Sequence, residues 1–125
     1  MKLEYLPDGS DDCPLVRMYD FVPTEVAGVL ASVSKLIYGT SQQIALHKLP
    51  GVEAVGECRL FISSGLKDQG LLQLAAPAAF ECILSKDGWE DVAGLIEPFS
   101  EGIVGYQWLS VIGDAKWLFS LNGTW

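Results

Sequence analysis

The sequence predicts an α+β fold, an antiparallel β-sheet with two helices on one face, formed by all 125 residues as a single domain. Two segments carry apolar residues at helical spacing, and eight shorter segments show the apolar runs or the alternation typical of strands. Clusters of glycine, proline and aspartate separate these segments, as turns require. Half of the residues are hydrophobic and 19% are charged, so the chain has enough apolar side chains for one core.

The first strand is expected over residues 3–6 and the second over residues 15–21. Between them, residues 7–12 include nearly every turn-forming residue type. The aspartates of this segment lack the spacing of a calcium-binding loop, so we interpret it as a solvated loop.

A helix is expected from Pro23 to Gly39, because the apolar residues recur there at intervals of three and four. Its apolar stripe consists of Val26, Val29, Leu30, Val33, Leu36 and Ile37. Two strands follow, residues 43–49 and 56–64, joined by a turn over residues 50–55.

The second half repeats this order. Strands are expected over residues 71–75 and 79–85, before a helix that Asp87 caps, with Glu90 three residues later. Proline inside a helix interrupts its hydrogen bonds, so this helix is expected to be broken or to end near Pro98.

The chain closes with a predicted hairpin of residues 104–112 and 115–122. The two residues between them, Gly113 and Asp114, suit a type II′ turn because glycine comes first. Strand, strand, helix, strand, strand therefore occurs twice along the chain.

We expect an internal duplication of this β-β-α-β-β unit, with repeats over residues 1–65 and 66–125. Sliding the second half onto the first places Phe119 on Phe61. The order is similar to that of duplicated strand-helix-strand-strand domains that bind small effectors in bacterial regulators, and more loosely to the paired modules of glyoxalase-like proteins. The similarity is one of element order alone, and the His and Glu metal ligands of glyoxalase-like proteins are not matched.

The short turn of the last hairpin determines which side chains share a face of the sheet. With Ile112 opposite Ala115, Trp108 is expected opposite Phe119. An aromatic face then consists of Tyr106, Trp108, Trp117, Phe119 and Leu121.

In the first half, one register separates apolar from polar residues best. It places on one face Ile44, Leu46, Cys58, Leu60 and Ile62, and on the other face Gln43, His47, Glu57, Arg59 and Phe61. This register separates Cys58 from His47, so a nucleophilic pair is not expected. Because Phe61 aligns with Phe119, the polar face of the first half is expected to continue the aromatic face of the second.

Three interpretations of the aromatic face stay open at this point. The face can be a groove for a small apolar or aromatic ligand, the core beneath the helices, or the centre of a homodimer interface. The ligand-binding hypothesis names Phe61, Tyr106, Trp108, Trp117 and Phe119 as groove residues and His47, Glu57 and Arg59 as orienting polar groups.

Charge limits the classes of partner. Acidic residues outnumber basic ones by 16 to 8, and the net charge of −8 makes nucleic acid an unexpected partner. The second helix concentrates acid at Asp87, Glu90, Asp91, Glu97 and Glu101. This gives an alternative hypothesis, an inhibitor-type or immunity-type module that binds a basic protein.

Motifs of known enzymes are missing from the sequence, including nucleophile elbows, phosphate loops and H-E-x-x-H. We therefore favour a non-enzymatic function, with a small enzyme that uses His47 as its acid or base as an alternative. The three cysteines, Cys13, Cys58 and Cys82, are far apart. Neither disulfides nor a zinc site is expected, and no metal or cofactor is predicted.

The N-terminal residues do not resemble a secretory signal, and no apolar run approaches the roughly 18–20 residues that cross a bilayer. We expect a cytoplasmic protein without a membrane partner.

Overall fold

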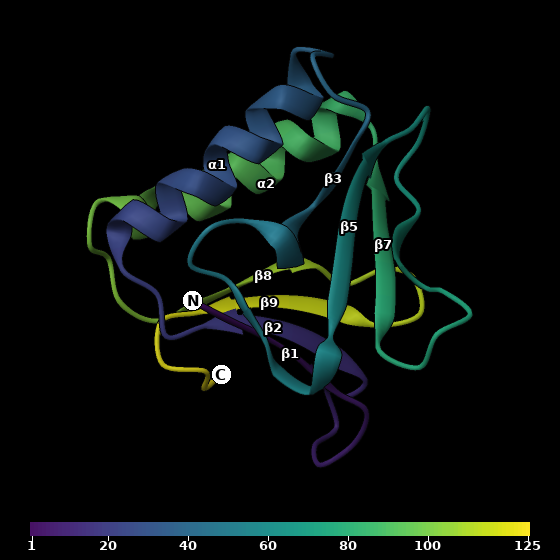
Figure 1. The fold of residues 1–125 in the computed structure, drawn as a ribbon, viewed down its shortest axis with the longest axis vertical. Coiled ribbons are helices and arrows are strands. Elements are labelled where there is room, and N and C mark those ends of the chain that lie inside the picture. The colour runs from purple at the N-terminus through teal and green to yellow at the C-terminus, as the bar shows by residue number, and fades with distance from the viewer.

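The computed structural model describes residues 1–125 and confirms the α+β class. Helices α1 (Pro23–Ile37) and α2 (Lys86–Ser100) pack side by side and cover two β-sheets that stand at an angle to each other (Figure 1). Sheet A contains β1 (Lys2–Leu6), β2 (Leu15–Tyr19), β4 (Glu53–Ala54), β8 (Tyr106–Ser110) and β9 (Lys116–Ser120). Sheet B contains β3 (Gln43–Ala45), β5 (Arg59–Ser64), β6 (Gly70–Gln73) and β7 (Ala79–Leu84).

The prediction of a single antiparallel sheet is wrong. The strand orders are β4-β1-β2-β9-β8 in sheet A and β3-β5-β7-β6 in sheet B. At the centre of each sheet lies a parallel pair, β2 with β9 and β5 with β7. Each sheet thus joins one hairpin from the first half of the chain to one from the second. Apolar alternation along a strand predicts which face is buried but not which strand lies beside it. The sequence therefore could not reveal that hairpins of the two halves pair with each other.

The two halves share one topology. If each strand is exchanged for its counterpart, β1-β2-β9-β8 becomes β6-β7-β5-β3, the order of sheet B from its other end. This correspondence supports the predicted duplication, which stays a prediction because a shared topology does not establish a common origin.

Both helices form where apolar residues recur at helical spacing. In α1 the buried residues include Val26, Val29, Val33 and Leu36, as predicted. Helix α2 begins earlier than predicted, because the Ser85 hydroxyl, and not Asp87, accepts the first backbone hydrogen bond, from Gly88 N at 3.2 Å. It also continues past Pro98 to Ser100.

The first hairpin of sheet B is shorter than predicted. Strand β3 ends at Ala45, and two short 3₁₀ helices, η1 (Leu46–Lys48) and η2 (Val55–Glu57), replace the expected strand ends. The predicted apolar face is nevertheless confirmed: Ile44 pairs with Ile62, and full burial is found for Leu46, Cys58, Leu60 and Ile62.

One continuous core fills the space between the helices and the inner faces of both sheets. Tyr5 of sheet A contacts Phe80 of sheet B with ring centroids 4.7 Å apart. Trp89 of α2 donates its indole N–H to the Ser63 carbonyl in β5 at 2.9 Å and lies edge-on to Trp117 of β9. The helices therefore hold the two sheets together.

Candidate functional site

The β8–β9 hairpin decides where the predicted aromatic face lies. Ser110 pairs with Trp117 as expected, but a bulge at Leu109 pairs Trp108 with Leu118 instead of Phe119. One extra residue turns the side chains on either side of it to different faces of the sheet. The prediction that Trp108 and Tyr106 share a face with Trp117 and Phe119 is therefore wrong.

The structure places Trp117 and Phe119 in the core, where neither is exposed. The Trp117 ring centroid lies 6.2 Å from that of Trp89, and the Phe119 centroid 5.4 Å from that of Phe99 in α2. These two residues fit the core interpretation. They can form neither an open groove nor the surface of a dimer.

Trp108 lies on the outer face of sheet A, where its ring meets Trp125 with centroids 6.4 Å apart. The Lys116 ammonium sits 5.4 Å from the Trp108 centroid. The Asp12 carboxylate accepts from both Lys116 and the Trp125 indole. Tyr106 is half-exposed and joins no such contact. Trp108 therefore packs within a network of contacts on this face and does not line an open groove.

The remaining predicted residues, which include Phe61 and Arg59, lie at sheet B, whereas Trp108 and Trp117 belong to sheet A. His47 stands edge-on to Phe61, with ring centroids 5.0 Å apart, and its Nδ1 accepts from Leu60 N at 3.1 Å. Glu57 and Arg59 are exposed and bond neither to each other nor to His47. The expected continuity between the polar and aromatic faces is therefore wrong, because Phe61 faces outwards and Phe119 inwards.

His47 should titrate below its usual range. Burial of the imidazole lowers its pKa, and the cations Lys48 and Arg59 add to this effect. The unfolded chain then takes up the proton at higher pH than the folded one. The contribution of neutral His47 to the free energy of unfolding should be fully present above pH about 6.5. It should be lost as pH decreases towards the pKa of the folded state. NMR titration of the His47 ring and urea unfolding between pH 5 and 8 measure both effects, and the His47→Gln variant should lack this pH dependence.

The two buried cysteines, Cys58 and Cys82, are not activated for chemistry. Burial raises the pKa of the Cys58 and Cys82 thiols to about 12, and all three cysteines are free. Such thiols stay protonated at neutral pH and behave as small apolar groups. No group of three or more His, Cys, Asp or Glu side chains is placed to hold a metal ion.

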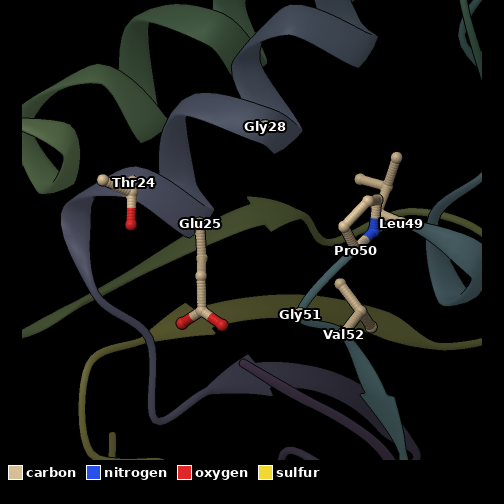
Figure 2. A pocket seen from close by; sticks show the side chains of 7 residues that line it. All are labelled: Thr24, Glu25, Gly28, Leu49, Pro50, Gly51 and Val52. Atoms are coloured by element: carbon tan, nitrogen blue, oxygen red, sulfur yellow. The ribbon is translucent and has the colours of Figure 1, made fainter.

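The largest hollow of the molecule, about 410 Å³, lies between the start of α1 and the segment before β4 (Figure 2). Glu25 is its only charged residue, and its remaining lining consists of Thr24, Gly28, Leu49, Pro50, Gly51 and Val52. The Glu25 side chain extends from the helix towards the sheet.

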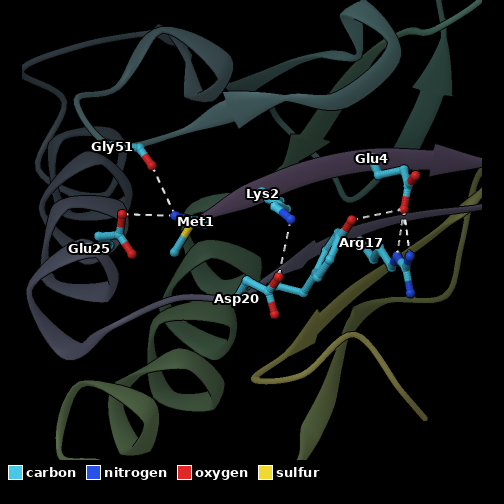
Figure 3. Close-up of polar contacts among 8 residues, drawn as sticks. Met1, Lys2, Glu4, Arg17, Asp20, Glu25 and Gly51 are labelled. Atoms are coloured by element: carbon cyan, nitrogen blue, oxygen red, sulfur yellow. Dashed lines mark hydrogen bonds and ion pairs between the residues drawn. The ribbon is translucent and has the colours of Figure 1, made fainter.

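Glu25 is fully engaged with the protein itself. Its Oε2 accepts from the Met1 ammonium at 2.8 Å, which also donates to the Gly51 carbonyl at 3.0 Å (Figure 3). Its Oε1 accepts from Val22 N at 3.0 Å. The hydrogen bond from the Met1 ammonium is the largest cause that lowers the Glu25 pKa. The hollow is thus large, but its one charged group stabilises the fold.

A smaller pocket of about 200 Å³ lies where the start of α2 meets the end of β8, and we name it the junction pocket. Its apolar residues are Leu84, Val92, Leu109, Val111 and Ile112, and the others are Asp68, Gly88, Asp91 and Ser110. Polar and apolar groups therefore meet in a space that fits a small molecule.

Two buried polar groups lack a hydrogen-bond partner in the protein, the Ser110 hydroxyl and the Trp117 indole N–H. Ser110 is only 8% exposed and lines the junction pocket. The two residues are directly paired across β8 and β9, so their side chains share a face. An unpaired buried hydroxyl costs free energy, so its presence here calls for an explanation.

The bulge and the β6 edge build this pocket. By re-aligning β8, the bulge at Leu109 turns Ser110 inwards while Trp108 points outwards. Residues 111–115 then do not form the predicted two-residue turn. They dock on β6 instead, where Leu71 N donates to Ile112 O at 3.2 Å and Asp114 N donates to Leu71 O at 2.7 Å.

The acidic side of the pocket is held by the start of α2. Asp68 Oδ1 accepts from both Ser85 N at 2.8 Å and Ser85 Oγ at 2.7 Å, and these bonds lower the Asp68 pKa. Gly88 permits this approach, since a side chain there would meet the Asp68 carboxylate. Asp68 is therefore ionised at neutral pH, next to the pocket.

Replacing Ser110 with alanine should leave the free energy of unfolding unchanged or raise it by up to about 1 kcal/mol, because the change removes an unpaired buried hydroxyl. Ser120 is the matched control, since it is a buried serine of the same hairpin that donates to Thr124 O at 2.6 Å. Ser120→Ala should cost about 1 kcal/mol. Urea unfolding measures both values, and an equal loss in the two variants would contradict the assignment of Ser110 as unpaired.

The sequence interpretation missed Ser110, Asp68 and Asp91 as components of one site. Ser110 stands alone among apolar neighbours, Leu109 and Val111, and that isolation was the one signal available. Asp68 gave none, because its position beside α2 depends on the turn between β5 and β6.

Neither helix combines the length and apolar character needed to cross a membrane. Comparisons with protein families, with curated proteins and with solved structures find no match to this chain.

Proposed function

We propose that the protein is a binding domain that holds a small, largely apolar molecule in the junction pocket. The observation that carries the proposal is the Ser110 hydroxyl, which is buried, lines the pocket and has no partner in the chain. A ligand that bonds to this hydroxyl would remove the cost of burying it unpaired.

The size and lining of the pocket support a small ligand. A cavity of about 150 Å³ can hold a molecule the size of benzene, and the junction pocket has about 200 Å³. Five apolar side chains line it, which matches the usual composition of ligand sites, a mainly apolar wall with few polar groups. The larger hollow beside Glu25 offers no comparable free group.

Self-association through the aromatic face has lost its basis, because Trp117 and Phe119 are buried in the core. A small enzyme that uses His47 is likewise not favoured, because the protein backbone already occupies Nδ1. The acidic residues of α2 are exposed, and no feature of the fold favours a particular basic protein as their partner.

The test is an NMR titration of the ¹⁵N-labelled protein with 1-pentanol, a probe with one hydroxyl and an apolar stem. We expect saturable shifts confined to amides around the pocket, such as those of Gly88, Ser110 and Ile112, with a Kd of about 1 mM or weaker, given only six heavy atoms. Ser110→Ala should weaken binding about fivefold by removing one hydrogen bond.

A second variant closes the pocket. Val111 is 61% exposed at the rim, so Val111→Trp should block the mouth and abolish binding. Ile103→Trp is the matched control, because Ile103 is 55% exposed and lies outside the pocket. Absent shifts, shifts centred on Glu25 and Gly51, or equal binding by both tryptophan variants would overturn the proposal.

A further inference from the structure

We propose that the junction pocket selects small aliphatic ammonium ions, with Asp91, Asp68 and Ser110 receiving the three N–H groups of a primary ammonium. The inference rests on the proposed function and adds the chemical class of the ligand. It starts from the charge of the lining: two of the nine lining residues are aspartates, and none is Lys, Arg or His.

Both carboxylates keep acceptor capacity for a ligand. The hydrogen bonds of Asp68 all use Oδ1, so its Oδ2 has no partner in the protein. Asp91 is exposed and forms no ion pair or hydrogen bond with the protein. Both carboxylates are exposed, so their free oxygens and the buried, unpartnered Ser110 hydroxyl form an acceptor set that a ligand can reach.

The backbone N–H of Gly88, which lines the pocket, already has a hydrogen-bond acceptor within the protein. The start of α2 exposes backbone N–H groups that would attract an anion, but the Ser85 hydroxyl accepts from Gly88 N and Asp68 accepts from Ser85 N. An anionic ligand would therefore meet two carboxylates without a free cation. An ammonium group has three donors and no acceptor, which complements Asp91, Asp68 and Ser110.

The apolar wall fixes the remainder of the ligand. Leu109, Val111 and Ile112 line the pocket and come from the same segment as Ser110, the end of β8 and the residues after it. An alkyl chain of four to five carbons can pack on these side chains while its charged end stays at the acidic side of the pocket. The net charge of −8 adds a general attraction for cations, which salt screens.

The experiment compares three probes of equal length on the wild-type protein at pH 7 and constant ionic strength: pentylammonium, 1-pentanol and pentanoate. We expect pentylammonium to bind at least tenfold tighter than 1-pentanol and pentanoate not to bind, as judged by the same pocket amides. Asp91→Asn should reduce the ratio between amine and alcohol several-fold, because only the Asp68 carboxylate then remains. Glu97→Gln, which removes an exposed charge of α2 outside the pocket, should leave the ratio unchanged.

The outcomes separate this inference from the proposed function. If 1-pentanol binds in the pocket and pentylammonium binds no tighter, the ammonium class is wrong and the binding domain stands. If no probe shifts the pocket amides, both are wrong. If pentylammonium binds tighter but Glu97→Gln reduces the preference as much as Asp91→Asn does, the attraction is general and the assigned site is overturned.

Discussion

Replacing Trp117 with alanine should lower the free energy of unfolding by about 3–5 kcal/mol, a large part of the roughly 5–15 kcal/mol that stabilises a domain of this size. Trp117 is unexposed and lies at the point where sheet A, α2 and the β8–β9 hairpin meet. Removal of its indole leaves a cavity beside Trp89 that rigid strands cannot close.

Trp108→Ala is the control for this variant. Trp108 lies nine positions earlier in the same hairpin, but on the outer face and only half-buried. Its loss should cost about 1 kcal/mol, in proportion to the smaller area that it buries. Urea unfolding followed by circular dichroism measures both variants. Equal costs would mean that the bulge at Leu109 does not separate the two side chains.

Gly70→Ala should cost about 3 kcal/mol or more and should also abolish 1-pentanol binding. Gly70 has a φ of 80°, and a Cβ there would collide with the Ile112 carbonyl. The alanine must therefore bear backbone strain and also push the segment after β8 away from β6. Because Ile112 lines the junction pocket, this displacement should disrupt the pocket as well.

Gly102→Ala separates strain from collision. Gly102 has a φ of 90°, but a Cβ there would meet no atom within 4 Å. The free energy of unfolding of Gly102→Ala should fall only by the cost of the left-handed conformation, about 1–2 kcal/mol. The variant should keep probe binding. Thermal unfolding and the same titration compare the variants. If Gly70→Ala were as stable as Gly102→Ala, the result would contradict the close contact between β6 and the Ile112 backbone.

Much of the local structure could be predicted because it depends on neighbouring residues. Helix α1 was predicted from its apolar spacing, and its expected apolar stripe is largely buried. The buried face of the first hairpin of sheet B was also predicted, because Leu60 and Ile62 alternate with more polar residues. These features require no knowledge of which strands meet.

The features that were missed depend on distant contacts. Gly113 and Asp114 suit a two-residue turn, but the edge of β6 binds this segment and opens the turn. The bulge at Leu109 could not be predicted from the sequence, because the two-residue turn expected at Gly113 and Asp114 implied a regular pairing of the two strands. One shifted pair was enough to misplace the whole aromatic face.

The candidate site was missed for the same reason. Two of the aromatic residues that suggested a groove, Trp117 and Phe119, are core residues, because large rings are as useful in packing as in binding. The junction pocket is assembled from the loop before β6, the start of α2 and the end of β8. Its acceptors become neighbours only through the parallel pairing of β5 with β7 and the docking of residues 111–115, after β8, on β6.

The parallel strands at the centre of each sheet also determine when the protein can fold during synthesis. Arg17 pairs with Leu118, so β2 has no partner in sheet A on this side until the ribosome has made the second helix and β9. Residues 1–65 contain two hairpins and a helix, but the hairpins belong to different sheets. The nascent first half therefore leaves two strand edges open, which makes it the stage most exposed to aggregation until the second half is synthesised.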